Sequence, residues 1–518
     1  MDQRLNWKAF IRDTKNKAQK AVNIIKILAK KSWGAHPSTL LTIYKGLIRA
    51  RLEWAISCSS SASPNYFNSI NTVQFAALRI ILGCFRSTPT NTLLDLAKEK
   101  SMRFRAQLLT ARYIARAQSF QGHPIIPKLK LLETYVKRGR VPAECLRFTI
   151  YRIWSKHKQH LESIKTYEIS PCFSIPIVAQ LSPININTSI GNIITTQNSN
   201  KQLNSLFEAK LIEKYNIDFK TNWTLIFTDG SKTKNADYVG AAFFIPETGA
   251  RALFRLSKLA TIFEAEASAI AEALKFMKNR LNKKNILIIT DSLSVITALD
   301  YTGISAKSHP LIAEIKSLTY RISLTNRNVE FLWCPSHKGI EGNEVVDGLA
   351  KAAIEKGSVI NINLTPRTIA KELQKKILDE EQISMKVTFS NKGTLYYKYS
   401  NPNTNTPWWK DMSLERKSIT LINRLRTGHI GVNNHLYRIG LVDYKECPCG
   451  HPEQSINHVF WECELNREHS DTLLGELIKL NVRPPLEIRS LSFSQSEKVL
   501  KAIKKFAEKI KDNTYLTY

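Results

Sequence analysis

Four acidic residues occupy positions in the sequence from which one fold could bring their carboxylates close together. Asp229 and Asp291 each end a predicted strand, in TLIFTDGS and NILIITDS, and each is followed by a turn or a helix start. Glu266 lies in the apolar helical segment FEAEASAIAEAL, where a carboxylate needs a partner. Asp347 lies in a predicted helix, one turn after Glu344. Because clustered carboxylates repel one another, this set predicts bound divalent cations, and hard oxygen ligands favour magnesium or manganese.

Each acid also has an ordinary interpretation when it is taken alone. Followed by Gly230 and Ser231, Asp229 has the sequence context of an ordinary turn aspartate. Asp291, followed by a serine at a predicted helix start, has that of an ordinary helix N-cap. The combination favours chemistry, because two divalent ions about 3.5–4 Å apart stabilise the attacking water and the leaving oxygen of an in-line phosphoryl displacement.

The elements that must position these acids alternate along the chain. The hydrophobic pattern predicts strands over residues 224–231, 238–245 and 250–256, a helix over 263–281, a strand over 285–290, a helix after Asp291, a strand over 329–335 and a helix over 344–356. Three antiparallel strands followed by alternating helices and strands predict an α/β fold with a mixed sheet. No glycine-rich phosphate loop or dinucleotide fingerprint follows any of these strands.

In their order, the segments TDGS, FEAEASAI, TDS and WCPSHKGIEGNEVVDGLA resemble the ribonuclease H type 1 family, in the form carried by retrotransposons without long terminal repeats. The resemblance implies a ribonuclease H-like mixed five-stranded sheet flanked by helices over residues 220–356. It also implies a two-metal endonuclease that cuts the RNA strand of RNA–DNA hybrids, leaving a 3′-hydroxyl and a 5′-phosphate. The metal is Mg²⁺, for which Mn²⁺ can substitute.

The resemblance assigns a role to each acid and to one histidine. Asp229 would bridge both ions, Glu266 and Asp291 would complete one metal site, and Asp347 would complete the other. Glu266 is preferred over Glu264, two residues earlier, because the family's glutamate follows an alanine and precedes the small-residue core of its helix.

His337, in the loop PSHKGIEGN, stands where the family keeps a mobile histidine that helps product release, although alone it is a solvated loop residue. The segment between Asp291 and Val329 is short and only modestly basic, so the basic handle that some cellular members use for hybrid binding is absent. Substrate binding is then expected to depend on other parts of the chain.

The segments AKKSWGAHPSTLLTIYKGLIRARLEWA and LRIILGCFRSTPTNTLLDLA resemble the region that follows the polymerase in retrotransposon reverse transcriptases. No Tyr-x-Asp-Asp motif or similar aspartate pair occurs, so we expect no polymerase activity. The resemblance implies the C-terminal part of a retroelement polyprotein, either a truncated copy or a gene model that starts late.

A second candidate metal site lies near the C-terminus. Cys447, Cys449, His458 and Cys463 supply three thiols and an imidazole, a soft ligand set that suits tetrahedral zinc. RLRTGHIGVNNHLYRIGL and CPCGHPEQSINHVFWEC resemble the tail that follows the ribonuclease H domain in the same retroelements, with His451 as a substitute ligand. The other five cysteines are interpreted as buried thiols and not as a disulfide framework: Cys58, Cys84, Cys145, Cys172 and Cys334.

The charge of the chain points to a polyanionic partner. There are 75 lysines and arginines against 44 aspartates and glutamates, a net charge of +31. Residues 2–120 carry a basic excess that is interpreted mainly as a solvated surface, with RNA or DNA contact through the basic flanks as the alternative. Trp408 and Trp409 are read as core anchors more readily than as base-stacking residues.

No lipidation motif, secretory signal or charge-free apolar run long enough to span a bilayer is found, so we expect no membrane association. We expect nuclear or cytoplasmic localisation, not secretion.

The predicted organisation is a helical region over residues 1–168, an uncharged linker over 169–204, the ribonuclease H domain over 220–356, and a helical C-terminal region over 365–518 with a small zinc-binding tail. The alternative function is a catalytically decayed remnant of a retroelement that still binds nucleic acid. Intact acids at all four positions favour the enzyme.

Overall fold

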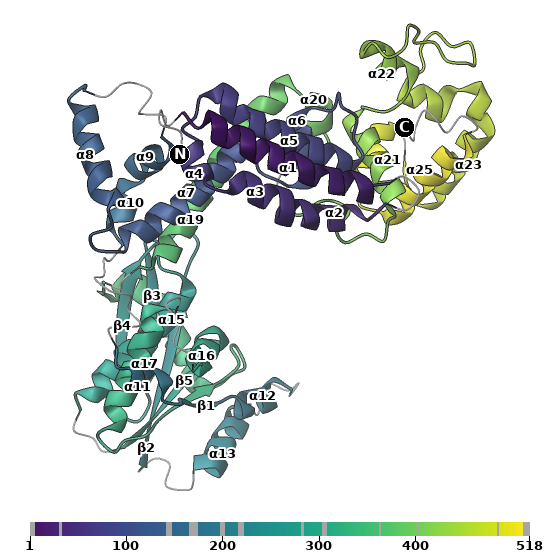
Figure 1. Cartoon of the computed structure of the whole chain (residues 1–518). Coiled ribbons are helices and arrows are strands. Elements are labelled where there is room, and N and C mark those ends of the chain that lie inside the picture. The colour runs from purple at the N-terminus through teal and green to yellow at the C-terminus, as the bar shows by residue number, and fades with distance from the viewer. Residues whose placement is uncertain are drawn as a thin grey trace. The chain divides into compact units, whose positions relative to one another are not determined.

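The computed structural model describes residues 6–30, 34–140, 148–164, 175–196, 203–215, 222–280, 284–302, 308–361, 364–401, 404–483 and 486–510. The chain forms two compact units, whose elements are labelled in Figure 1. The helical unit comprises residues 1–110, 142–153 and 375–518, and the sheet unit comprises residues 111–141 and 154–374.

The sheet unit is built on one seven-stranded mixed sheet in the order β1-β6-β5-β2-β3-β4-β7. Strands β2, β3 and β4 form an antiparallel meander, whereas β5 lies parallel to β2 and to β6. Short strands β1 and β7 pair in parallel with β6 and β4 at the two edges. The strands are β1 (Asn185–Asn187), β2 (Trp223–Ser231), β3 (Tyr238–Ile245), β4 (Ala250–Ser257), β5 (Asn285–Thr290), β6 (Val329–Trp333) and β7 (Ser358–Val359).

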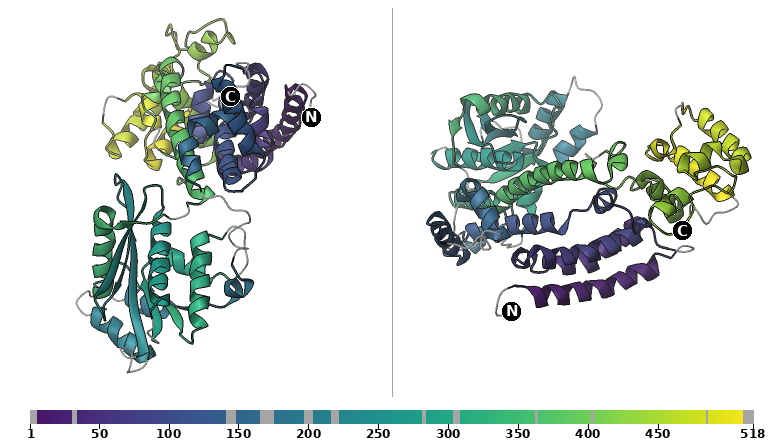
Figure 2. Two further views of the ribbon diagram at one scale, coloured as in Figure 1. Left: turned by 90° about the vertical axis from the view of Figure 1, so that its left-hand side faces the viewer. Right: turned by 90° about the horizontal axis from the view of Figure 1, so that it is seen from above.

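Helices cover both faces of this sheet, as the left view of Figure 2 shows. Successive strand residues point to opposite faces, so Ile226 packs with α15 (Ile262–Lys278), α16 (Leu293–Asp300) and α17 (Pro310–Ser323). Phe227 packs on the other face with α12 (Ser189–Thr195), α13 (Leu203–Tyr215) and α18 (Glu341–Lys356). The sheet unit also contains α8 (Ile125–Lys137), α10 (Lys158–Glu162) and α11 (Ile177–Leu181).

The expected mixed sheet flanked by helices is confirmed, but the expected number of five strands is wrong. The two additional strands, β1 and β7, contain only 3 and 2 residues. Strands this short show no readable alternation of apolar and polar residues.

The described parts of the expected linker, residues 175–196 and 203–204, contain regular secondary structure: α11, β1, α12 and the start of α13. Ile190 and Ile194 are buried in the core under the sheet. Asn187 Nδ2 donates to the hydroxyl of Tyr215 at 3.3 Å, which ties β1 to α13. The low charge that suggested a linker instead reflects an edge strand and a helix packed on the sheet. Residues 169–174 and 197–202 lie outside the described residues.

The helical unit joins the N-terminal and C-terminal regions, which the sequence had suggested were separate, around one hydrophobic core that includes Ile81 and Ile422. Its elements are α1 (Lys8–Leu28), α2 (Pro37–Ile43), η1 (Tyr44–Arg49), α3 (Ala50–Glu53), α4 (Ile56–Ser59), α5 (Pro64–Leu82), α6 (Thr90–Ala97), α20 (Thr394–Tyr397), α21 (Arg416–Thr427), α22 (Asn433–Arg438), η5 (His458–Glu462), η6 (Glu464–Asn466), α23 (Arg467–Lys479), α24 (Ile488–Ser492) and α25 (Glu497–Lys509). The boundaries between the units fall within α7 (Met102–Gln118), near α9 (Thr149–Lys156) and within α19 (Pro366–Asn391).

Part of the basic character of α21 is used inside the helical unit. Three of its side chains cap the carbonyl groups at the end of α5, where the helix dipole is negative. The hydrogen bonds run from Arg416 Nη1 to Ile81 O (3.0 Å), from Arg416 Nη2 to Ile80 O (2.7 Å), from Asn423 Nδ2 to Leu82 O (3.0 Å) and from Arg424 Nε to Gly83 O (2.8 Å). These arginines therefore hold helices together and do not form a free basic surface.

Within the described ranges, no helix combines the length and the apolar composition needed to cross a bilayer.

Two glycines of α18 provide a matched test of how closely the helix packs on the sheet. A Cβ at Gly342 would lie 2.3 Å from the Phe227 ring, whereas a Cβ at Gly348 would meet nothing within 4 Å. We expect Gly342→Ala to lower the free energy of unfolding by about 1–3 kcal/mol through overpacking. Gly348→Ala should raise it by about 0.5–1 kcal/mol, because alanine favours the helix. Urea denaturation measures both, and equal effects at the two positions would contradict the packing described.

Candidate active site

Asp229 and Asp291 reach the same edge of the sheet because β2 and β5 are parallel neighbours. In their register Thr228 lies opposite Thr290, so the next residues, Asp229 in β2 and Asp291 just after β5, lie beside each other. The backbone of Asp291 is held by β6, since Trp333 Nε1 donates to its carbonyl oxygen at 3.1 Å. The sheet itself therefore brings the two carboxylates together.

Glu266 joins them because α15 packs very closely on β2. A Cβ at Gly230 would lie 2.7 Å from the backbone nitrogen of Glu266 and 2.8 Å from the Cβ of Ala265, so no side chain fits there. The glycine after Asp229 thus serves the approach of the helix as well as the turn expected from the sequence.

The three carboxylates form a compact group, in which Asp229 and Glu266 are buried and Asp291 is partly buried. One oxygen of each of Asp229, Glu266 and Asp291 lies within 4.8 Å of the others. Asp229 is 6% exposed and Glu266 is 7% exposed. Burial raises the pKa of all three groups, to about 7 for Asp229, and repulsion from neighbouring carboxylates raises those of Asp229 and Glu266 further.

This group fits a divalent cation. The buried Oε2 atom of Glu266 has no hydrogen-bond partner among the described residues. A buried carboxylate oxygen without a partner is costly, and a cation would satisfy it while removing the repulsion within the group. An all-oxygen donor set is the set that magnesium and manganese prefer.

Asp347 lies on α18 and is not part of that compact group. Its carboxylate comes together with His337 and Glu344, with one ligand atom of each within 4.8 Å of the others. Its charge nevertheless raises the pKa of both Asp229 and Asp291. The four expected acids therefore belong to one electrostatic site, with Asp347 at its side.

Two basic side chains accompany this side of the site. Lys351 Nζ lies 2.6 Å from Asp347 Oδ2, one helical turn away, on an exposed face. His337 is exposed in the loop before α18 and has a φ of 54°, a left-handed conformation that is uncommon for a residue other than glycine. Its charge lowers the pKa of Asp291, against the larger effect of burial.

Glu264 lies outside the group and has a structural role. It forms a capping box with Thr261 at the start of α15. Its Oε1 atom accepts a hydrogen bond from Thr368 at 2.8 Å and lies 3.3 Å from His309 Nε2. The sequence preference for Glu266 over Glu264 agrees with this placement.

Asn343 is a site residue that sequence reasoning did not single out. It is 4% exposed, and its side chain lowers the pKa of Asp291, against the larger effect of burial. Cys334 lies beside it, and burial together with the nearby carboxylates raises the pKa of that thiol, which stays protonated. Asn343 lies within the motif that carries the family resemblance, but nothing in its local pattern indicates an effect on Asp291.

The C-terminal Cys/His residues also converge, in the helical unit. One ligand atom of each of Cys447, Cys449, His458 and Cys463 lies within 4.8 Å of the others. Cys447 Sγ and Cys463 Sγ are 3.8 Å apart, and Cys449 Sγ is 3.2 Å from His458 Nε2. Zinc–sulfur bonds of about 2.3 Å set two thiolates about 3.8 Å apart on a tetrahedral ion, so the donors fit zinc. His451 stacks on His458 with ring centroids 4.1 Å apart.

The solvent exposure of the tryptophans and cysteines decides the remaining sequence predictions. Trp409 is fully buried, and Trp408 Nε1 donates to Asn423 Oδ1 at 3.0 Å, so both tryptophans anchor the core. Of the five cysteines expected to be buried thiols, Cys334 is buried, Cys84 is partly buried and Cys58 is exposed. Cys145 and Cys172 lie outside the described residues.

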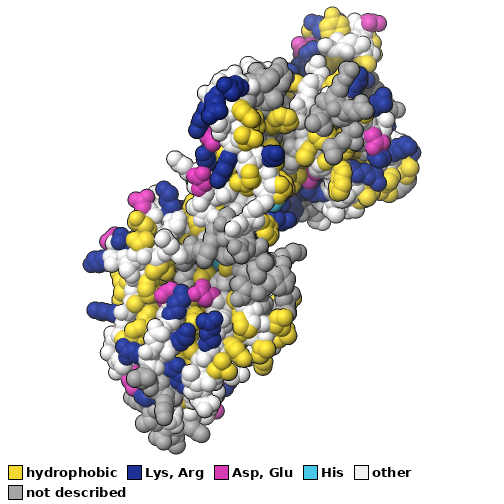
Figure 3. All heavy atoms as spheres, turned by 60° about the vertical axis from the view of Figure 1, so that its left-hand side comes forward, with side chains coloured by type: hydrophobic (Ala, Val, Ile, Leu, Met, Phe, Trp, Pro, Cys, Tyr) yellow, Lys and Arg dark blue, Asp and Glu magenta, His cyan; other side chains and the backbone are white. Residues whose placement is uncertain are grey.

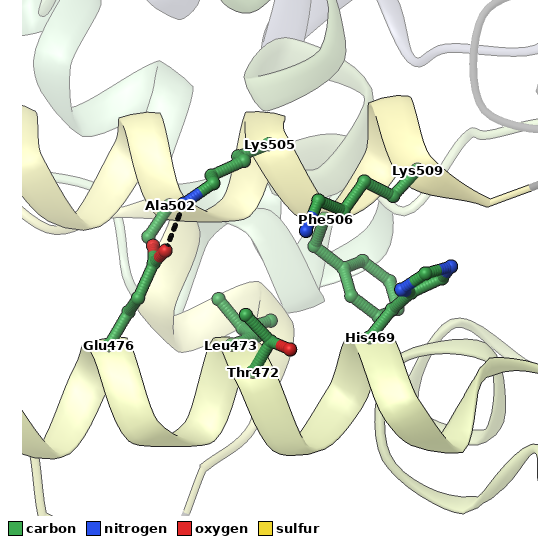
Figure 4. Close-up of a pocket in the computed structure, with 8 residues that line it drawn as sticks. All are labelled: His469, Thr472, Leu473, Glu476, Ala502, Lys505, Phe506 and Lys509. Atoms are coloured by element: carbon green, nitrogen blue, oxygen red, sulfur yellow. Dashed lines mark hydrogen bonds and ion pairs between the residues drawn. The ribbon is translucent and has the colours of Figure 1, made fainter.

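Two clefts that lie away from the carboxylates offer no comparable site. The cleft between α23 and α25 has a volume of about 10 Å³, and in Figure 4 Lys505 reaches across it to Glu476. A cleft of about 450 Å³ lies at the far end of α15 from Glu266, where Lys275 pairs with Glu314. Lysines and arginines are scattered over the face shown in Figure 3, among apolar and neutral side chains.

The raised pKa of Asp229 predicts how stability changes with pH in protein without metal. Between pH 4 and about 7 the folded state holds a proton that the unfolded state, with a pKa near 3.8, has lost, so this group destabilises the fold progressively as pH rises. We expect Asp229→Asn to be more stable than the parent by about 1–3 kcal/mol at pH 7, and by much less at pH 4.

Urea denaturation in EDTA measures this difference. The buried His429 and His435, whose pKa values are lowered to about 4, give the opposite slope, but they are common to both proteins and cancel. A difference that stays constant or shrinks as pH rises would contradict the described burial of Asp229.

Comparison with known proteins agrees with this geometry for one part of the chain. No curated protein matches the chain. Residues 221–355, which contain all four acids and His337, match the model of the RNase H family, and this part of the chain is therefore an RNase H domain.

Proposed function

We propose that the protein is a divalent-metal-dependent endonuclease that hydrolyses the RNA strand of RNA–DNA hybrids. The observation that carries this proposal is the buried group of Asp229, Glu266 and Asp291, with an unpaired Glu266 oxygen, inside the segment that matches the RNase H family. Three carboxylates in one buried place serve no packing purpose, whereas they suit metal-assisted phosphoryl chemistry.

The metal ligands are proposed as follows. Asp229, at the centre, would contact both ions, Glu266 and Asp291 would complete one site, and Asp347 would complete the other. Two magnesium ions, when bound, supply stabilisation of the attacking water and of the leaving oxygen at the RNA phosphate.

The side chains of the protein contribute position and charge. Asp229 and Asp291 are held by paired strands and Glu266 by a capped helix, so little reorganisation accompanies metal binding. Lys351 pairs with Asp347, and it would give up this ion pair if that carboxylate held a cation. His337, exposed beside Glu344 and Asp347, is placed to assist departure of the product phosphate.

The substrate is an RNA–DNA hybrid, and the net charge of +31 supports additional backbone contacts from the basic flanks. We also propose an origin in a retrotransposon without long terminal repeats. The order of the RNase H motifs and the flanking segments on both sides support it. The same flanks carry no polymerase aspartate pair, and no polymerase activity is proposed.

Removal of the central carboxylate tests the proposed activity. We expect Asp229→Asn and Glu266→Gln to lower magnesium-dependent cleavage of a labelled RNA–DNA hybrid by at least about 10³-fold, because each removes a metal ligand and its charge. Glu272→Gln on the same helix, which only loses an ion pair with Lys275, should cut like the parent.

The full chain is compared on the hybrid, on duplex RNA and on duplex DNA. Cleavage that survives Asp229→Asn would contradict the proposal. Salt-dependent binding of the hybrid without any cleavage would favour a catalytically decayed, nucleic-acid-binding remnant.

We further propose that Cys447, Cys449, His458 and Cys463 hold a structural zinc ion. The described donors surround one point, and Gln454 Nε2 lies 3.8 Å from Cys447 Sγ, as expected for a donor to a thiolate. The ion would close the loop before η5 onto the helical core, which contains Val459 and Phe460.

Zinc content and stability test this second site. Cys449→Ser should reduce zinc, measured by atomic absorption, from one equivalent to well under half, and lower the free energy of unfolding by at least about 2 kcal/mol. Cys58→Ser, which changes an exposed cysteine of the same unit, should alter neither. Parent protein that contains no zinc after zinc-supplemented refolding would rule the site out.

A further inference from the structure

A polar cluster that the proposed cleavage does not use lies in the helical unit. It is formed by the loop between α5 and α6, the residues after α21, and α22. Ser87 Oγ lies 2.9 Å from Nδ1 of His429 and 3.2 Å from Nε2 of His435. The two imidazole rings lie 4.8 Å apart between centroids, and Arg438 Nη2 lies 3.1 Å from Nδ1 of His435. Four polar side chains therefore form one connected chain of contacts.

The contacts indicate where the protons of this chain lie. A guanidinium can only donate, so Nδ1 of His435 accepts from Arg438 and the proton of that ring lies on Nε2. That N–H group donates to Ser87, whose own proton is left for Nδ1 of His429. The proton of the His429 ring then lies on Nε2, and none of the described residues accepts a hydrogen bond from that atom. The chain therefore ends in a donor.

A second guanidinium lies beside this end of the cluster. A Cβ at Gly428, the residue before His429, would lie 2.4 Å from Nη2 of Arg489. No described residue accepts a hydrogen bond from the Arg489 side chain, and its Nε atom is buried. Glu487, two residues earlier, accepts from the hydroxyl of Tyr399 at 2.5 Å and forms no ion pair with Arg489. A buried cationic donor without an acceptor is costly, and an anionic ligand would satisfy it.

The donors of the cluster are accessible, and two of them carry positive charge. Arg438 is exposed, and His429 and Arg489 are partly exposed. Burial and the neighbouring positive charges lower the pKa of His429 to about 4, so its ring is neutral at pH 7. Within the described ranges, no carboxylate pairs with either arginine or with either histidine. Several donors and two positive charges without a carboxylate favour an anionic ligand.

We propose that Arg438, Arg489 and the Nε2–H group of His429 form a phosphate-binding site, which holds the backbone of a nucleic-acid strand on the helical unit. Guanidinium groups bind phosphate oxygens through paired N–H donors. The net charge of +31 favours a polyanion as the source of the phosphate.

This site differs from the arginines of α21. The donors of Arg416 and Arg424 are engaged by carbonyl groups of α5, whereas those of Arg489 are not engaged by any described residue. Because phosphate contacts read no bases, the site would position a strand of any sequence. The inference goes beyond the proposed function and does not depend on cleavage.

Binding of a fluorescent single-stranded DNA oligonucleotide to the full chain, measured by anisotropy without added metal, tests the site. We expect Arg438→Gln and Arg489→Gln each to weaken binding by about 3- to 10-fold at low salt, whatever the base sequence. Each should also reduce the slope of log K against log salt concentration by about one, because one phosphate contact is lost. His429→Phe removes a neutral donor, so it should weaken binding by a smaller factor and leave the slope unchanged.

Arg12→Gln is the matched control, since it removes the same charge from the exposed face of α1. Arg12 lies one turn after Lys8, whose Nζ lies 5.5 Å from the Tyr66 ring at the start of α5, whereas Ser87 follows the end of α5. This variant should keep the affinity and the salt slope of the parent. Thermal unfolding shows that each variant is folded, and the exposed Arg438 decides the test if Arg489→Gln does not fold.

Competition by inorganic phosphate separates a phosphate site from general attraction. At equal ionic strength, sodium phosphate should weaken DNA binding by the parent more than sodium chloride does. The difference should disappear in the double variant Arg438→Gln/Arg489→Gln. Arg438→Lys, which keeps the charge without the paired donors, should recover only part of the loss.

The outcomes are independent of the proposed activity, since no step of the test involves cleavage of a hybrid. Parent-like affinity and salt slope in Arg438→Gln and Arg489→Gln, or an equal loss in Arg12→Gln, overturns the site. Phosphate competition that the double variant abolishes without a change in DNA affinity overturns the nucleic acid as the occupant and favours a small phosphate-containing ligand. A parent that binds DNA as expected but cuts no hybrid overturns only the proposed activity.

Discussion

Repulsion among buried carboxylates is the constraint on which the sheet unit depends. Asp229, Glu266 and Asp291 come from three different elements, and without a cation each disfavours the charge of the others. Such a group persists only when the surrounding structure holds it, and here strand register, the missing side chain of Gly230 and the capping box of α15 do so. A bound divalent cation would remove this repulsion, and the proposed phosphoryl chemistry would use the same cation.

The basic charge of the chain has more than one use. Arg416 and Arg424 donate to the carbonyl end of α5, and Arg426 Nε donates to Ser492 O at 2.7 Å within the same helical core. Such cations stabilise the helical unit and cannot also contact a phosphate backbone. The charge left for a nucleic acid is therefore smaller than the net value of +31 suggests, and on the face shown in Figure 3 it is scattered among apolar and neutral side chains.

The sequence predicts best what is local. Apolar runs that end in an aspartate identified β2 and β5, and hence the edge where Asp229 and Asp291 meet, while family resemblance selected Glu266 over Glu264. Strands β1 and β7 were missed because they are too short to show a period. Helix α17 was not assigned either, although His309 and Pro310 form a normal helix start. Contacts between distant residues were not predictable either. No local sequence pattern indicates the hydrogen bond between Cys334 and Asn343 or the burial of Arg424 against α5.

The central claim is that the three carboxylates are a cation site kept partly protonated until metal arrives. It is tested most directly by proton release when Mg²⁺ is added to metal-free protein in weakly buffered solution near pH 6, below the raised pKa of Asp229 of about 7. Because a cation displaces protons from carboxyl groups of raised pKa, the account predicts release of about one proton for each protein molecule that binds Mg²⁺. Saturable Mg²⁺ binding without proton release would contradict it.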